Sequence, residues 1–324
     1  MCVFCFNGAK VTKFLLYLAK QKDIMNKIIV IGSSNTDMVV RSERLPRAGE
    51  SVLGDTFMMA GGGKGANQAV AVARMGHKVL FAAAVGDDMF GDAAIAGYQR
   101  FGIDTSFVVR KSTPSGVALI MVDGAGQNSI SVALGANNCL TVEDVNPALD
   151  LIESGDIVLL QLEIPMATVD ACVAVAAEKG ARVVLNPAPA AVVSEQTLSK
   201  LYLITPNQTE AQTLTGIEVT DEASAELAAQ VLVSWGVERV VITMGSAGAY
   251  LYQAGEGVMI PAYKVDAVDT TAAGDVYNGA LCAALAEGMS LEQALHFATK
   301  ASAISVTRAG AQPSVPSREE VENF

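Results

Sequence analysis

Residues 269–281 read DTTAAGDVYNGAL, a turn of small residues that leads into an apolar helical pattern. Small residues allow backbone N–H groups to converge on an anion, and the helix N-terminus adds positive potential. Asp275 stands in the first turn of this helix, where its carboxylate would repel a phosphate. We therefore predict that Asp275 is a general base and that Ala272, Ala273 and Gly274 form an anion hole. Taken alone, the same carboxylate could simply complement the helix dipole.

Outward from this turn, apolar runs of strand length alternate with helical patterns. The runs lie at residues 27–31, 79–85, 157–162, 182–185, 201–204 and 240–244. Such alternation predicts an α/β fold with a doubly wound, mostly parallel sheet flanked by helices.

Two regions break the alternation. One is residues 51–59, and the other pairs residues 116–122 with 128–134 across a glycine-containing turn at 123–127. The second region reads as a β-hairpin. We expect lid strands near residues 36–59 and 114–136, forming a small antiparallel β lid. An exposed antiparallel edge is a natural pairing surface, so we also expect a homodimer through this lid.

Composition narrows the class of protein. The chain has 324 residues, of which 51% are hydrophobic, so one large α/β domain is expected. A net charge of -12 disfavours nucleic acid as a partner. The two histidines, His77 and His296, are too few for a His-rich metal site. Five cysteines without a disulfide pattern predict a reducing compartment, the cytoplasm by default.

Residues 1–24 differ from the rest of the chain. Their apolar run, Phe14 to Ala19, is too short to span a membrane, and no cleavage site for export follows it. We expect residues 1–24 to be an unstructured extension and residues 25–324 to form the catalytic domain, with no membrane association.

Besides the turn at 269–275, the sequence contains a second motif. Residues 62–69 read GGKGANQA, with Gly76 and Gly86 further along. The two motifs together resemble the signatures of the PfkB family of carbohydrate kinases, from about Lys27 to the C-terminus. Many relatives have glycine where this chain has Ala272. Segments 32–37, 186–189 and 310–314 resemble the members of the family that phosphorylate ribose.

The resemblance implies the activity and the site residues. The expected reaction transfers a phosphoryl group from ATP to the primary hydroxyl of a small sugar, with the 5-hydroxyl of D-ribose as the expected acceptor. In the family, residues at these positions line the sugar pocket: Asn35, Asp37, Gly63, Lys64, Asn67, Glu163 and Asp275. The positions implied for ATP are Asn207, Thr243, Gly245, Gly248 and Gly274.

The resemblance also implies two cations. Asn207 and Glu210 would hold Mg²⁺ through water, which suits an ion that prefers oxygen ligands and keeps its hydration. A monovalent cation, K⁺ in most relatives, would be held by Asp269, Thr271, Ser305, Gly310 and Ser314. Without the resemblance, Asn207 and Glu210 are equally typical of a helix cap.

Four other functions are consistent with parts of the sequence. A dehydrogenase is disfavoured because the glycine-rich segment at 61–66 does not directly follow the first strand. A P-loop kinase is disfavoured because Lys64 is followed by Gly65 rather than by Ser or Thr. A kinase of deoxyribose or of a nucleoside on the same fold stays open, as does a sugar-binding regulator without activity. Asp275, Asn207 and Glu210 argue against the regulator.

Overall fold

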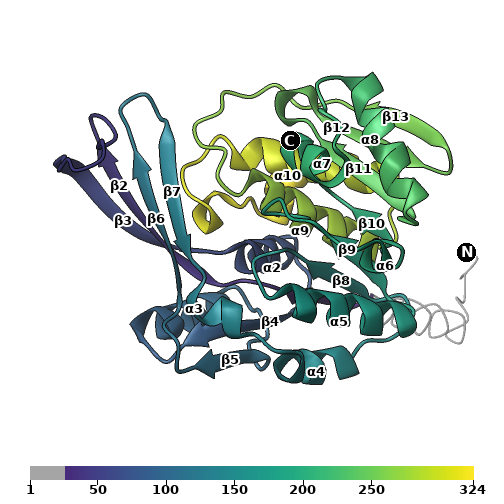
Figure 1. Ribbon diagram of the computed structural model, residues 1–324, viewed down its shortest axis with the longest axis horizontal. Coiled ribbons are helices and arrows are strands. Elements are labelled where there is room, and N and C mark those ends of the chain that lie inside the picture. The colour runs from purple at the N-terminus through teal and green to yellow at the C-terminus, as the bar shows by residue number, and fades with distance from the viewer. Residues whose placement is uncertain (1–25) are drawn as a thin grey trace, which may run out of the picture.

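The computed structural model describes residues 26–324 (Figure 1). The extension expected at residues 1–24 lies outside the described residues. Within residues 26–324, no helix is long and apolar enough to cross a membrane.

The centre of the protein is a nine-stranded sheet. In sheet order its strands are β13 (Glu256–Ile260), β12 (Ala249–Gln253), β11 (Arg239–Thr243), β10 (Leu203–Ile204), β9 (Arg182–Leu185), β8 (Ile157–Leu160), β1 (Ile28–Ile31), β4 (Val79–Gly86) and β5 (Val108–Lys111). Neighbours from β11 to β5 pair in parallel, whereas β12 pairs antiparallel with β11 and β13. The predicted sheet is confirmed. The sequence analysis missed β5, β12 and β13, which lie at or next to the sheet edges and carry more polar residues.

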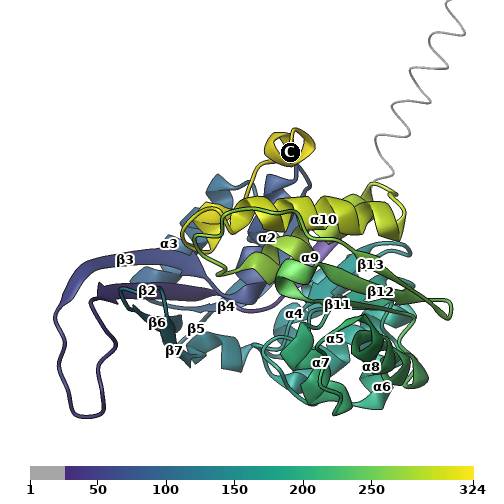
Figure 2. The ribbon, with the colours of Figure 1, turned by 90° about the horizontal axis from the view of Figure 1, so that it is seen from above.

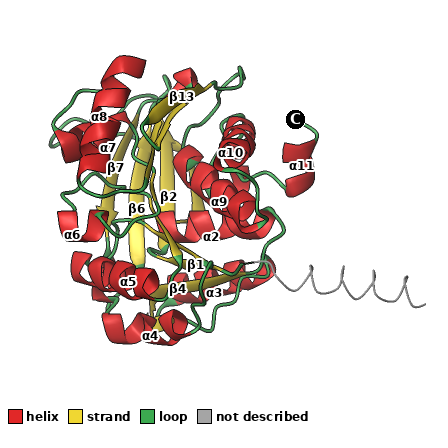
Figure 3. Cartoon of the chain, turned by 90° about the vertical axis from the view of Figure 1, so that its right-hand side faces the viewer, coloured by secondary structure: helices red, strands yellow, loops and turns green. Residues whose placement is uncertain are grey.

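Both faces of the sheet are buried, which explains the continuous apolar runs. Ile28 and Val30 pack into one helical layer and Ile29 and Ile31 into the other. The first layer contains α2 (Lys64–Arg74), α3 (Met89–Arg100), α9 (Ala273–Ala286), α10 (Leu291–Ser305) and α11 (Arg318–Glu322). The second contains α4 (Val142–Asp150), α5 (Met166–Glu178), α6 (Glu195–Leu198), α7 (Gln208–Thr215) and α8 (Glu222–Ser234). Figure 3 shows the helices on both sides of the strands.

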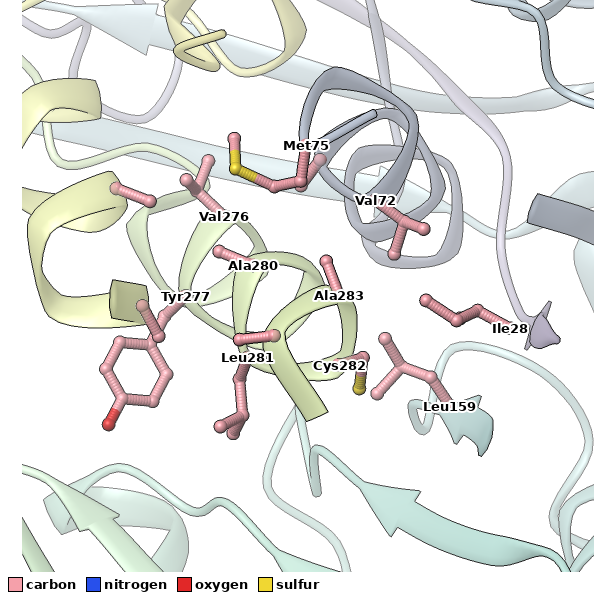
Figure 4. Packing of buried hydrophobic residues seen from close by; sticks show 14 of the residues in the cluster. Ile28, Val72, Met75, Leu159, Val276, Tyr277, Ala280, Leu281, Cys282 and Ala283 are labelled. Carbon is pink, nitrogen blue, oxygen red and sulfur yellow. The ribbon is translucent and has the colours of Figure 1, made fainter. Parts of the chain in front are cut away.

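Helix α9 is buried around its whole circumference from Asp275 to Ala286, and most of its residues are apolar. Figure 4 shows Val276 and Ala280 on the side of α9 that faces Val72 and Met75 of α2, and all four residues belong to one buried apolar cluster. At Gly279 the helices approach so closely that a Cβ would lie 2.4 Å from the Cβ of Ala71. This contact brings the first turns of α2 and α9 together, and those turns carry the two sequence motifs.

A separate four-stranded sheet forms the lid and extends away from the helical body (Figures 1 and 2). Its order is β3 (Gly54–Gly62), β2 (Asn35–Ser42), β6 (Gly116–Val122) and β7 (Asn128–Ala133). The predicted hairpin is β6 and β7. We expected an antiparallel lid, and this prediction is wrong for one pair of strands, because β2 and β6 pair in parallel. The strand expected at residues 51–59 lies a few residues later, at β3.

Candidate active site

The turn before α9 has the left-handed backbone that an anion-binding turn needs. Ala272 caps the helix with a φ of 60°, a conformation that an alanine adopts at a cost. The Ala273 N–H donates to Thr270 O at 3.2 Å, so this amide is already satisfied within the turn. An anion bound at this turn would compete with Thr270 O for the Ala273 N–H, and Ala272, Ala273 and Gly274 stay the candidates for the anion hole.

The strain at Ala272 can be measured. We expect Ala272→Gly to raise the free energy of unfolding by about 1 kcal/mol, because glycine adopts positive φ without the Cβ clash. The matched control is Ala273→Gly, one residue inside the helix, where glycine should instead lower stability by roughly 0.5–1 kcal/mol. Urea unfolding of both variants checks this. Equal destabilisation by the two glycines would show that Ala272 is not strained.

Asp275 lies at the junction of α9 and α2 and is buried. Its Oδ2 accepts a hydrogen bond from Asn67 Nδ2 at 2.9 Å, and its Oδ1 accepts one from Gln68 Nε2 at 3.0 Å. Burial raises the pKa of Asp275, against the opposing effects of Lys64 and of these two hydrogen bonds. A carboxylate with a raised pKa is better suited to accept a proton than an ordinary surface aspartate.

The predicted sugar residues surround this carboxylate. Gly63 has a φ of 88° and would place a Cβ 2.7 Å from Asn35 N, so only glycine fits between the end of β3 and the start of α2. The Lys64 N–H donates to Glu163 Oε2 at 3.2 Å, and Ser33 Oγ donates to the same oxygen at 2.6 Å. Asn35 is held by Asn137, whose Nδ2 donates to Asn35 Oδ1 at 2.7 Å.

Negative charge is concentrated around one lysine. Burial, followed by the charges of Glu163 and Asp275, raises the pKa of Asp37 to about 6. Burial opposes the charge on Lys64, but the carboxylates of Asp275, Glu163 and Glu210 outweigh it and raise the lysine pKa. One cationic side chain thus faces several carboxylates, although within residues 26–324 no three His, Cys, Asp or Glu side chains are grouped so as to hold a metal ion.

A cavity of about 740 Å³ opens beside α9 and is large enough for a nucleotide. All five residues predicted to bind ATP line it: Asn207, Thr243, Gly245, Gly248 and Gly274. The sequence analysis missed others that line it, among them Tyr263, Tyr277, Thr299 and Ser302. Tyr277 stands two residues after Asp275 in the quoted motif, but an aromatic residue in an apolar helix indicates packing, and no motif marks Tyr263, Thr299 or Ser302.

Asn207 and Glu210 form a reciprocal helix cap at the start of α7. Asn207 Oδ1 accepts from the Glu210 N–H at 2.8 Å, and both oxygens of Glu210 accept from Asn207. Burial raises the pKa of Glu210, although the Asn207 N–H and Lys64 lower it. Asn207 lines the nucleotide cavity, whereas Glu210 lies behind it. Both interpretations of this pair, cap and cation site, are compatible with the geometry.

The residues implied for the monovalent cation are only partly brought together. Asp269 accepts hydrogen bonds from the N–H groups of Thr271 at 2.9 Å and Gly310 at 2.8 Å. Burial opposes the charge on Asp269, but these hydrogen bonds outweigh it and lower the pKa. All three residues line a second cavity of about 210 Å³, which Asp37 also lines. Ser305 and Ser314 are buried, and neither lines this cavity.

Comparison with known proteins identifies the family of this chain. Residues 25–318 match the pfkB family of carbohydrate kinases. The chain is 43% identical to the ribokinase of Haemophilus influenzae over 92% of its own length and 97% of the relative's. It is 37% identical to a deoxyribokinase of Salmonella typhi, over 92% and 98%. The structure of Arabidopsis thaliana ribokinase complexed with ribose and ATP is similar, with a TM-score of 0.83, 31% identity and coverage of 92% and 98%.

Proposed function

Because this chain belongs to the pfkB family of carbohydrate kinases, we propose that it transfers the terminal phosphoryl group of ATP to the 5-hydroxyl of D-ribose. The enzyme is an ATP-dependent carbohydrate kinase. The observation that carries the proposal is Asp275, a buried carboxylate that adjoins both the nucleotide cavity, through Gly274, and the predicted sugar residues, through Asn67.

In the proposed mechanism, Asn35, Asp37, Gly63, Lys64, Asn67 and Glu163 bind the sugar. Asp275 accepts the proton of the attacking hydroxyl, and the N-terminus of α9 stabilises the charge on the transferred group. Asn207, Thr243, Gly245, Gly248 and Gly274 bind ATP.

Two cations complete the proposal. Asn207 and Glu210 would hold Mg²⁺ through water, and the ion would neutralise phosphate charge; the place of Asn207 on the wall of the nucleotide cavity supports this. Asp269, Thr271, Ser305, Gly310 and Ser314 would hold K⁺, with support from the ionised state of Asp269 and its place beside Thr271 and Gly310. We also propose the cytoplasm as compartment, because Cys139, Cys172 and Cys282 are free.

A panel of acceptors tests the substrate. Ribose, 2-deoxyribose, fructose, adenosine and inosine would each be offered with ATP and Mg²⁺, and ADP release measured. We expect the highest kcat/KM for ribose. The deoxyribokinase relative makes 2-deoxyribose the second candidate, and a higher kcat/KM for it than for ribose would overturn the ribose assignment.

The pKa of Asp37 predicts how sugar binding depends on pH. Only the ionised carboxylate accepts hydrogen bonds at both oxygens, and Asp37 loses its charge as the pH falls through about 6. We therefore expect the Kd for ribose to be constant above pH 7 and to rise about tenfold for each pH unit well below 6. Calorimetric titration without ATP measures this. Asp37→Asn should abolish the dependence, and its persistence in that variant would assign it to another group.

The outer face of the lid supports a homodimer. Phe57, Met59, Leu119 and Met121 all lie on the lid face opposite Asp37, and the strand register makes them neighbours. Each is at least one-third exposed, so together they form an apolar patch that a second copy of the chain would cover.

A matched pair of variants tests the dimer. Leu119 on the lid and Leu227 on α8 are each 55% exposed. We expect a dimer for the unaltered protein at micromolar concentration, a monomer for Leu119→Glu, and a dimer for Leu227→Glu. Sedimentation velocity distinguishes these states. A monomeric unaltered protein, or dissociation by Leu227→Glu alone, would refute the lid as the interface.

A further inference from the structure

Asp275 is held by buried amide side chains that the sequence analysis did not identify. Gln68 on α2 is fully buried, and its Nε2 donates both to Asp275 Oδ1 and to Asn186 Oδ1, each at 3.0 Å. Its Oε1 accepts a hydrogen bond from Gln161 Nε2. Both ends of the Gln68 amide are therefore engaged, and rotation of this amide would break all three hydrogen bonds.

The chain of hydrogen bonds continues beyond Asn186 and returns to α9. Asn186 Nδ2 donates to Thr205 O at 3.3 Å, and Thr205 Oγ1 donates to Asn278 Oδ1 at 2.6 Å. Asn278 Nδ2 donates to Gly274 O at 2.8 Å. Because Gly274 O belongs to the peptide that leads into Asp275, the same network fixes the backbone and the carboxylate of this residue. All side chains of this hydrogen-bond network are buried.

The two oxygens of Asp275 are consequently not equivalent. Oδ1 faces the Gln68 amide, which would have to break its three hydrogen bonds to turn and accept a hydrogen bond from a protonated Oδ1. Oδ2 faces Asn67 Nδ2, and Asn67 Oδ1 has no hydrogen-bond partner within residues 26–324. Asn67 can thus turn over and accept a hydrogen bond when Oδ2 becomes protonated, without breaking a second contact of its amide.

We infer that Gln68 is a positioning residue for phosphoryl transfer, which occupies Oδ1 of Asp275 and so directs the proton of the sugar hydroxyl to Oδ2. The inference rests on the proposed function. In this step the sugar O–H bond breaks and its proton moves to Oδ2. The sugar oxygen forms a bond to the terminal phosphorus of ATP, and ADP leaves with the electron pair of the broken O–P bond.

The dependence of kcat on pH distinguishes a positioning role of Gln68 from a role in packing alone. The charged groups that face Asp275 are Lys64, Glu163, Glu210 and Asp37. Replacing Gln68 with methionine changes none of them and preserves the length of the side chain. The substitution removes one N–H that stabilises the ionised form of Asp275 and so raises the pKa of this residue. The acidic limb of the plot of kcat against pH must therefore move to higher pH.

The experiment measures kcat against pH at saturating ribose and ATP. For Gln68→Met we expect kcat to fall by about ten- to a hundredfold and the acidic limb to rise by roughly one pH unit, with the Kd values for both substrates within about threefold. For Gln161→Met, which leaves Gln68 in place but frees its carbonyl, we expect a smaller shift in the same direction. Thr168→Val is the control, because Thr168 is buried on the other face of the sheet and donates only to Leu140 O.

Each outcome decides the inference. A shifted limb in Gln68→Met and a smaller shift in Gln161→Met support it, with no shift in Thr168→Val. A folded Gln68→Met with an unmoved limb overturns it, even if kcat falls, because a packing defect lowers kcat without changing the proton acceptor. If Gln68→Met does not fold, Gln161→Met decides by the same criterion. Failure of the proposed function is seen separately, as normal turnover of Asp275→Asn.

Discussion

Asp275→Asn is expected to lower kcat by roughly 10²- to 10⁴-fold while ribose and ATP still bind. Asparagine keeps the size of the side chain and accepts hydrogen bonds at one position only, but it cannot take the proton of the attacking hydroxyl at neutral pH. A general base acts on the transition state, so the loss should appear in kcat rather than in the Kd of either substrate. Stopped assays of ADP release and calorimetry of ribose binding measure the two effects.

The control for this variant is Asp266→Asn, in the exposed loop that leads to the same turn. It removes one carboxylate from the region without touching the predicted sugar or nucleotide residues, so its kcat should stay within about twofold of the unaltered enzyme. Near-normal turnover of Asp275→Asn would remove Asp275 from the mechanism. A loss of ribose binding equal to the loss of kcat would make it a binding residue instead.

The sequence was informative where chemistry depends on local spacing. The turn at 269–275 and the glycine-rich start of α2 are contiguous segments, and the hydrogen bond between Asn67 and Asp275 shows that the two segments lie together in the fold. The five residues that the resemblance implies for ATP come from short segments, and the structure places all of them on the wall of one cavity. Apolar runs identified the buried strands because these strands are covered on both faces.

The sequence was not informative where function depends on contacts between distant residues. Gln68 and Asp275 are separated by 207 positions, and only the approach of α2 to α9 at Gly279 joins them. Asn137, which holds Asn35, comes from a short helical turn 102 positions away. Nor does sequence show whether a backbone N–H is already engaged, as it is at Ala273.

The second large effect is expected for Asp37→Ala. If Asp37 accepts hydrogen bonds from the ribose hydroxyls, its removal loses charge-assisted bonds worth about 1.5–3 kcal/mol each and leaves those hydroxyls unpaired. We expect kcat/KM for ribose to fall by roughly 10²-fold or more. The control is Asp55→Ala, on the neighbouring lid strand β3, where the residue is exposed and lies at a break in the pairing with β2. Steady-state kinetics with varied ribose measure the loss.

The same variant should make the protein more stable, and this opposite sign separates binding from folding. Folding raises the pKa of Asp37 from its ordinary value of 3.8 to about 6, so the folded protein binds a proton more readily than the unfolded chain does. Stability due to this group is present below pH 3.8 and is lost as the pH rises to 6. Above that window the charged carboxylate costs up to about 3 kcal/mol, which Asp37→Ala would recover. Urea unfolding at pH 8 and near pH 4 should therefore show a stabilised variant only at the higher pH. A variant that is inactive and also destabilised at pH 8 would mean that Asp37 supports the fold of the lid, and that its loss of activity says nothing about the sugar.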